Sequence, residues 1–315
     1  VALKPEEGSI IFKKLGLEKK IKQVYLDITN FKVLNNLINK EKPDIIFHLA
    51  AQSIVSYSYE KPLKTMLSNV IGSTNILEAV RLNKVKNLVY ITSDKCYFND
   101  DRRTPYFEND ILGGEDPYSI SKACAELVFQ TYNKSFFKGE QKLSYATTRA
   151  GNVIGGGDMK KNRIVPDVIK SLQRRKRLII RSPAATRPWQ HVMEPLSGYL
   201  TLGHLLINKK LTDGIEPHWN FGPNPSNCKK VVEVVKKIIS VWGIDKKIFI
   251  SKNKKFKESK LLMLSNLKAK KELNWFPRLT FSETIELTVD WYKAFFSKRN
   301  IEKITTDQID YYTYK

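Results

Sequence analysis

The chain has few cysteines and no long apolar run. Its 315 residues include three cysteines, Cys96, Cys124 and Cys228, and no C-x-x-C pair. An odd number without close spacing predicts neither a disulfide framework nor a zinc site, and it favours a reducing, cytoplasmic location. The histidines do not cluster with carboxylates at ligand spacing, so we expect no metal. No apolar segment approaches the roughly 20 residues of a membrane span, so we expect no membrane partner.

Acidic residues are also scarce relative to basic ones. The chain has 54 Lys and Arg against 32 Asp and Glu, a formal charge of +22. Such a charge is compatible with nucleic-acid binding. The lysines are dispersed, however, in pairs such as Lys13-Lys14 and Lys270-Lys271. Dispersed lysine indicates a solvated surface that attracts anionic small molecules, so we expect no nucleic-acid partner.

Buried strands alternate with helices in the first half of the chain. Apolar runs at 44–50 and 87–92 predict buried strands, and a further strand is expected at 143–149. Helices are expected at 31–40, 62–83 and 118–137. This alternation predicts an α/β fold, a doubly wound parallel sheet with right-handed crossovers. After Ala150 the rhythm weakens, and shorter elements predict a smaller mixed α/β lobe. We therefore divide the chain at 1–150 and 151–315, with 181–209 partly returning to the large domain.

Two polar motifs follow the predicted strands. Tyr118 and Lys122 are four residues apart, so both side chains share one helix face. A nearby ammonium favours the phenolate and lowers the pKa of the tyrosine, so the pair can remove a hydroxyl proton. Alone, this spacing is equally typical of a surface tyrosine beside a lysine. The context is more specific, because Ser93-Asp94-Lys95 ends the preceding strand, where such folds place catalytic groups.

Six stretches in order resemble the extended short-chain dehydrogenase/reductases, and among these the CDP-glucose 4,6-dehydratases. They are HLAAQ at 48–52, ITSDKCY at 91–97, DPYSxSKxCAEL at 116–127, RAGNVIGGGD at 149–158, RPWQHVxEPLSGYL at 187–200 and WNFGP at 219–223. The Ser-Asp-Lys triplet is the most specific part. By this resemblance, the triplet separates the chain from the dTDP-glucose dehydratases, which have Thr-Asp-Glu at these positions. It also separates the chain from the 4-epimerases, which lack this acid arrangement.

The resemblance implies a Rossmann-like fold, NAD, and dehydration of CDP-glucose to CDP-4-keto-6-deoxyglucose, a step of deoxysugar and surface-polysaccharide (O-antigen) synthesis. Tyr118, supported by Lys122, would take the C4 hydroxyl proton, and Ser93 would bind the C4 oxygen. Asp94, if protonated, would donate to the departing C6 hydroxyl. Lys95 would remove the C5 proton or stabilise the enolate. The alternative for Asp94 is a loop carboxylate paired with Lys95 or Lys122.

The cofactor residues are also implied by the resemblance. The acid after the second sheet segment would contact adenine, and small residues after a later strand would line the nicotinamide side. A helix asparagine would support the active site, although a buried asparagine bonded to backbone is the alternative. The implied cofactor-binding residues are Asp27, Ile28, Ala50, Ala51, Gln52, Asn69, Tyr118 and Lys122.

The substrate residues are expected in the second half. Asn152 and Arg187 are candidates for the sugar diphosphate, because a guanidinium fork suits phosphate geometry, and Arg163 is a further candidate. His191 either contacts substrate or is structural. The glycines at 155–157 fail the G-x-G-x-x-G spacing and predict a turn. The resemblance also implies a homodimer through helices 62–83 and 118–137, whose alternative role is core packing.

The opening unit of a dinucleotide fold is missing from this sequence. Such a fold begins with a strand, a Gly-rich turn and a helix, roughly 30 residues in all. Val1-Ala2-Leu3 instead resembles the end of the second strand, and Lys4 stands where many relatives have Asp. The chain is then a fragment of a normal dehydratase or a degenerate binding or scaffold protein that binds NAD poorly. A nucleotide-sugar 4-epimerase, another 4,6-dehydratase and a basic nucleic-acid-associated protein are further alternatives.

Overall fold

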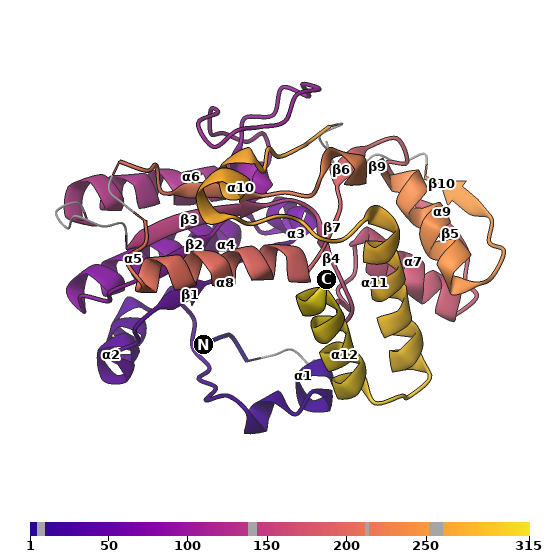
Figure 1. Cartoon of the computed structure of the whole chain (residues 1–315), viewed down its shortest axis with the longest axis horizontal. Helices are drawn as coiled ribbons and strands as arrows, with labels where there is room; N and C mark the ends of the chain where they lie inside the picture. Colours follow the sequence, from indigo (N-terminus) through magenta and orange to yellow (C-terminus); the bar gives the residue numbers. More distant parts are fainter. Residues whose placement is uncertain (5–9, 138–143, 212–213, 252–260) are drawn as a thin grey trace.

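A parallel β-sheet forms the centre of the first half of the molecule (Figure 1). The computed structural model describes residues 1–4, 10–137, 144–211, 214–251 and 261–315. Within these residues the sheet has the order β1-β2-β3-β8, and every neighbouring pair is parallel. Its strands are β1 (Ile46–His48), β2 (Leu88–Ile91), β3 (Tyr145–Ala150) and β8 (His218–Phe221). Of the residues predicted at the start of β3, 143 lies outside the described residues.

Helices cover both faces of this sheet. Leu88 and Tyr90 of β2 pack against α5 (Gly72–Leu82) and α6 (Pro117–Tyr132). Val89 points to the opposite face, where it packs against Leu202 and Leu206 of α8 (Met193–Ile207). Successive residues of a strand face opposite sides, so β2 is buried on both. This arrangement confirms the predicted Rossmann-like, doubly wound α/β fold.

The predicted helix 62–83 is interrupted by a wider turn. It consists of α4 (Pro62–Met66), the π-turn η2 (Leu67–Ile71) and α5, and Pro62 stands in the first turn of α4. Upstream, α2 (Phe31–Glu41) begins at Asn30, whose side chain accepts a hydrogen bond from the backbone N–H of Val33. Ala2 forms a parallel bridge with Tyr25. A π-turn within a helix often marks a functional position.

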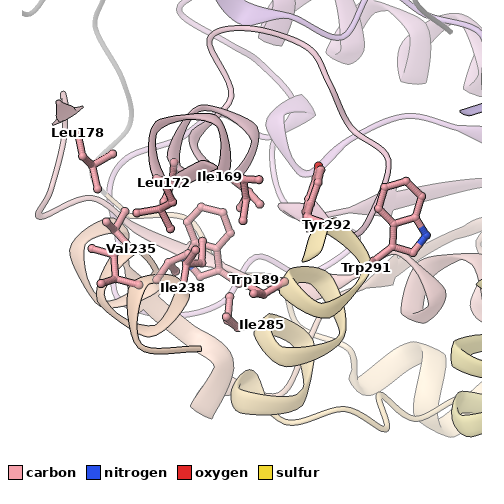
Figure 2. Close-up of a cluster of buried hydrophobic side chains, with 14 of the residues drawn as sticks. Ile169, Leu172, Leu178, Trp189, Val235, Ile238, Ile285, Trp291 and Tyr292 are labelled. Carbon is pink, nitrogen blue, oxygen red and sulfur yellow. The ribbon is translucent and has the colours of Figure 1, made fainter. Parts of the chain in front are cut away.

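A second hydrophobic core lies in the C-terminal half. It is formed by α7 (Ile164–Gln173), α9 (Val231–Trp242) and α11 (Phe281–Phe296), with the parallel pair β5 (Leu178–Ile180) and β10 (Ile248–Ile250). Trp189 lies among Ile169, Leu172 and Ile238 at its centre, and Trp291 and Tyr292 lie beside them (Figure 2). The buried residues of this core all belong to the second half, whereas another core joins Val89 and Ala146 of the sheet to Leu202 and Leu206 of α8. The division at residue 150 stays a prediction.

The remaining elements are short or were not predicted. The helix α12 (Ile301–Tyr314) was missed, and it begins at Asn300, whose side chain accepts from Lys303 N–H. No helix in the described residues is both long and apolar enough to span a membrane. The other elements are α1 (Ile10–Lys14), η1 (Leu17–Lys19), α3 (Val55–Glu60), η3 (Asp94–Cys96), η4 (Asn133–Phe137), β4 (Val153–Ile154), β6 (Thr186–Pro188), β7 (Gln190–His191), η5 (Pro225–Asn227), β9 (Cys228–Lys230) and α10 (Leu267–Leu273).

Candidate active site

The Ser93-Asp94-Lys95 triplet forms a tight turn at the carboxyl end of β2. The Ser93 hydroxyl oxygen accepts a hydrogen bond from the backbone N–H of Lys95 at 3.2 Å and donates to Asp94 Oδ1 at 3.0 Å. This local cap begins the single turn η3, which fixes the direction of all three side chains. Ser93 and Asp94 are buried, whereas Lys95 is only partly buried.

Tyr118 and Lys122 lie near the beginning of α6. Asp116 caps this helix by accepting hydrogen bonds from the N–H groups of Tyr118 and Ser119, at 3.0 and 2.9 Å. Pro117 at the first helical position fixes the backbone for helix initiation. Tyr118 and Lys122 are one turn apart and both are buried. The cap therefore places the phenol and the ammonium on the helix face that packs against the sheet.

One cavity joins the catalytic and substrate candidates. Its volume is about 630 Å³, within the range of small-molecule sites. The triplet and Tyr118 line it at one end, and polar residues of the second half line the rest. The sequence-predicted residues on its wall are Ser93, Asp94, Lys95, Tyr118, Asn152, Arg163 and Arg187. The structure thus brings together residues that are up to 94 positions apart, from 93 to 187.

Burial controls the electrostatics of Asp94. Desolvation raises the pKa of this carboxyl, although Lys95, the Ser93 hydroxyl and Arg187 act in the opposite direction. The net pKa is above the usual value. Oδ2 of Asp94 is buried and makes no hydrogen bond within the described part of the chain. A carboxyl with a raised pKa and a free oxygen can hold a proton and donate it. The alternative, a loop carboxylate paired with Lys95 or Lys122, predicts a lowered pKa instead, and the charge of Lys95 does act in that direction.

The expected effect of Lys122 on Tyr118 is wrong for this structure. Burial raises the pKa of Tyr118 to about 12, and the charges of Asp94 and Asp116 act in the same direction. Burial also lowers the pKa of Lys122 to about 8. Desolvation disfavours the charged form of either group. The sequence spacing predicted a charge interaction but contained no information on this desolvation.

The cofactor candidates follow β1 and flank α6. Asn69 in the π-turn η2 accepts a hydrogen bond from Gln52 N–H at 2.7 Å and donates to Gln52 O at 2.9 Å. It also donates to Ser121 Oγ at 3.0 Å. Asn69 is therefore bonded to backbone, and it also ties the segment at 50–52 to the catalytic helix. We expect the π-turn to be the feature that turns this side chain inward.

NAD is the cofactor that the resemblance implies, and the surroundings of Lys122 test whether the site fits it. The Lys122 side chain is buried, and burial lowers the pKa of its amine. Buried ammonium groups require acceptors, and ribose hydroxyl oxygens provide them. Earlier in the chain, Asp27 accepts from Thr29 N–H and Oγ1, and Ile28 is buried beside Gly72. The residues present fit the ribose and nicotinamide portions.

The four substrate candidates differ in position. Arg163 forms an ion pair with Asp158 at 3.0 Å and donates to Ser53 Oγ at 2.7 Å, across the cavity wall. Arg187 is buried and donates to Thr186 O at 2.8 Å. Asn152 lines the cavity. The fourth, His191, is buried outside the lining, and burial lowers its pKa to about 4. A neutral, enclosed histidine fits the structural alternative better than substrate contact.

A buried ion pair beneath the site was not given a role from sequence. Glu126 and Arg149 are fully buried and 2.8 Å apart. Glu126 also accepts hydrogen bonds from the hydroxyls of Thr92 and Thr147, and Arg149 donates to Tyr97 Oη at 2.8 Å. Glu126 lies one turn after Lys122, so this network ties α6 to the strand ends. A charged residue on the sheet-facing side of α6 was the signal available in the sequence.

Breaking this pair from one side should destabilise the protein strongly. Glu126→Leu leaves the Arg149 guanidinium buried without its counter-ion, so the free energy of unfolding should fall by about 3–5 kcal/mol. Urea denaturation measures the change. The double variant Glu126→Leu/Arg149→Met removes both charges and should recover most of the loss. A loss below about 1 kcal/mol in the single variant, as for an exposed pair, would show that the pair is not the structural tie described.

The comparisons with known proteins agree with this geometry. Residues 9–288 match the model of the GDP-mannose 4,6 dehydratase family. The chain belongs to this family. A relative, the CDP-glucose 4,6-dehydratase of Salmonella typhimurium strain LT2, is 42% identical over 275 residues, which are 85% of this chain and 76% of that protein. The family match and this identity show that the chain is a homologue of the 4,6-dehydratases.

Solved structures of dehydratases and epimerases share the fold. The dTDP-glucose 4,6-dehydratase of Bacillus anthracis, in complex with NAD, is 25% identical, with a TM-score of 0.71 over 86% of this chain and 79% of that one. The UDP-glucuronic acid 4-epimerase of Bacillus cereus, in complex with UDP-glucuronic acid and NAD, is 20% identical, with a TM-score of 0.77 over 90% and 85%. The second likeness concerns the fold alone.

Proposed function

We propose that this protein is an NAD-dependent CDP-glucose 4,6-dehydratase, a lyase that converts CDP-glucose to CDP-4-keto-6-deoxyglucose and water. One observation supports this most: the buried Asp94, with its raised pKa, lies in the same cavity as Tyr118. Removing a C6 hydroxyl requires a second proton donor at that position, whereas inverting C4 needs only the one group that takes and returns the proton of the C4 hydroxyl. The 42% identity to a CDP-glucose 4,6-dehydratase supports the same choice.

The residues of the cavity divide the chemistry between them. Tyr118 takes the C4 hydroxyl proton, while the Ser93 hydroxyl binds the oxygen that becomes a ketone. The ketone makes the C5 proton acidic, and Lys95 removes that proton or stabilises the enolate that forms. Asp94 gives its proton to the C6 hydroxyl, the C6–O bond breaks, and water leaves as the C5–C6 double bond forms. Once hydride has been returned to C6 and a proton to C5, the net change is the loss of one water without net oxidation.

Lys122, Asn69 and the segment at 50–52 would hold the cofactor beside Tyr118. NAD, when bound, accepts hydride from C4 and returns it to C6, and its positive charge favours the Tyr118 phenolate. Lys122 would bind the ribose, while Asp27 and Ile28 would contact adenine. We accordingly propose that 1–150 binds cofactor and 151–315 mainly binds substrate. No residue of this chain is assigned to the cofactor pyrophosphate.

The diphosphate of the substrate would lie between Arg187 and Arg163. Arg187 already faces the Asp94 end of the cavity, because its charge acts on that carboxyl. Arg163 reaches across to Ser53 from the opposite wall. Guanidinium groups bind phosphate oxygens with two parallel hydrogen bonds. Asn152 completes this part of the wall.

A panel of nucleotide sugars tests the proposed function. The purified protein and NAD are incubated separately with CDP-glucose, dTDP-glucose and UDP-glucose, and products are followed by mass spectrometry and NMR. We expect a product lighter by one water, formed from CDP-glucose at least about tenfold faster than from the others. An epimer of unchanged mass would identify a 4-epimerase. Faster conversion of another nucleotide sugar would identify a different 4,6-dehydratase, and binding without conversion a degenerate protein.

We also propose a homodimer, a reducing cytoplasmic location and a role in deoxysugar synthesis for surface polysaccharides such as O-antigen. The three cysteines are free.

The dimer is supported by exposed apolar residues on two adjoining helical segments, α4–η2 and α6. These residues are Leu63, Leu67, Ile71 and Leu127. Paired with a second copy, the two segments would form a four-helix bundle.

A charge in this apolar face should separate the dimer. Leu67→Glu places a carboxylate in the proposed interface, where its desolvation opposes association. Light scattering coupled to size-exclusion chromatography should show a monomer. Leu200→Glu is the matched control, since Leu200 is an exposed leucine of α8 on the opposite face of the sheet. A monomeric unmodified protein, or a dimer that persists in Leu67→Glu, would contradict this interface.

A further inference from the structure

The cavity has a second end, distant from the catalytic turn along the chain. Asp167 and Val168 of α7, Leu178 and Ile180 of β5, and the following Arg181 and Ser182 line it. In the proposed reaction the sugar lies at Tyr118 and the diphosphate lies beside Arg187 and Arg163. The nucleotide base then occupies this remaining end. The inference that follows rests on the proposed function.

Asp167 is held at this end by the second core. Ile169 and Leu172 anchor α7 in the second core, and Figure 2 shows both within the cluster. Asp167 is partly buried, and this burial raises the pKa of its carboxyl, while the charges of Lys170 and Arg181 act in the opposite direction. The backbone N–H of Asn162 also faces it. The cavity wall therefore has a fixed, acceptor-only group with a cationic neighbour.

At position 4 of the ring, a carboxylate matches cytosine and opposes uracil and thymine. Cytosine has an exocyclic amino group that donates hydrogen bonds, beside two acceptors, N3 and O2. Uracil and thymine have a carbonyl oxygen in place of the amino group, and their N3 is a donor. A carboxylate accepts from the amino group and repels the carbonyl oxygen, while a guanidinium donates to acceptors only. Ile179 of β5, which is exposed and lines the cavity, offers an apolar surface to the ring.

We propose that Asp167 accepts the hydrogen bond of the cytosine amino group and thereby selects CDP-sugars over UDP-sugars and dTDP-sugars. Arg181, on the same wall, donates to the acceptor side of the ring. Asp167 also lies in the first turn of α7, where a negative charge stabilises the helix by itself. The two roles differ in their consequence, because helix stabilisation affects every substrate equally.

The variant Asp167→Asn separates these roles. Its amide keeps an acceptor for the Asn162 N–H and can also donate to a carbonyl oxygen. We measure kcat/KM for CDP-glucose and UDP-glucose with saturating NAD, together with the melting temperature. The ratio of the two kcat/KM values should fall by about 10- to 100-fold, mainly through KM. Asp290→Asn is the matched control, since Asp290 also has a raised pKa beside a lysine and an arginine but does not line the cavity.

The other outcomes also decide the proposal. An unchanged ratio, or an equal loss with both substrates and a lower melting temperature, would overturn it in favour of helix stabilisation. If the unmodified protein dehydrates no nucleotide sugar, the proposed function fails, and calorimetric binding of CDP and UDP then tests Asp167 separately. A preference for CDP that Asp167→Asn removes would support the proposal, and equal binding of both nucleotides would contradict it.

Discussion

Replacing Tyr118 with phenylalanine should abolish oxidation at C4. Tyr118 lies buried on the cavity wall beside Ser93 and Asp94, where its hydroxyl is the group proposed to take the C4 proton. General-base catalysis contributes about 10²–10⁴-fold, so kcat should fall by at least that factor. The variant retains the ring and its packing, so substrate affinity should change little.

The measurement for Tyr118→Phe is single-turnover absorbance of the reduced cofactor after mixing with CDP-glucose. Tyr199→Phe is the control, because Tyr199 is another buried tyrosine on the same cavity wall to which we assign no proton transfer. It should retain more than about a tenth of the activity, since packing is preserved. Equal losses in the two variants would show that the Tyr118 hydroxyl has no special role.

Replacing Asp94 with asparagine should separate oxidation from water loss. An amide cannot give a proton to the departing C6 hydroxyl, so turnover should fall by about 10²–10⁴-fold. Oxidation at C4 depends on Tyr118 and should continue. The sugar should therefore accumulate as the 4-keto compound that still has its C6 hydroxyl, and rapid quenching with mass spectrometry detects it. Asp158→Asn, a second carboxylate on the cavity wall, should leave the proportion of this compound unchanged.

The pH dependence follows from the same group. Burial raises the pKa of Asp94, and the proposed step requires the protonated form. Water loss should therefore slow as pH rises through the pKa of Asp94, and this limb should disappear in Asp94→Asn. A decline at low pH instead would indicate that the ionised carboxylate is the active form. Equal and mild effects of the Tyr118 and Asp94 changes would contradict both assigned roles.

The elements that could be predicted are those with strong local signals. The apolar runs of β1 and β2, the further strand expected at β3 and the helices between them predicted the doubly wound sheet correctly, with ends displaced by a few residues. The positions of Tyr118 and of the Ser93–Lys95 turn on one cavity also followed, because parallel strands end at the same edge. In each case the chain neighbours alone determine the conformation.

The missed features depend on distant contacts. α12 is polar along much of its length, and its buried Tyr312 donates to Glu194, 118 positions away. The pKa of Tyr118 depends on burial by several elements, which the spacing to Lys122 does not describe. Glu126 and Arg149 resemble surface charges until α6 is packed against β3. Asp167 likewise becomes significant only when β5 folds beside α7. Such properties arise from tertiary packing and desolvation.

The most direct test of the account follows the hydrogen atom at C4. CDP-glucose deuterated at C4 is incubated with the purified protein and unlabelled NAD, and the product is examined by NMR. We predict a 4-keto-6-deoxy product with the deuterium at C6 of the same sugar, because the atom removed at C4 is returned after water leaves. Deuterium retained at C4, in an epimer or in unchanged CDP-glucose, would contradict the proposed dehydratase.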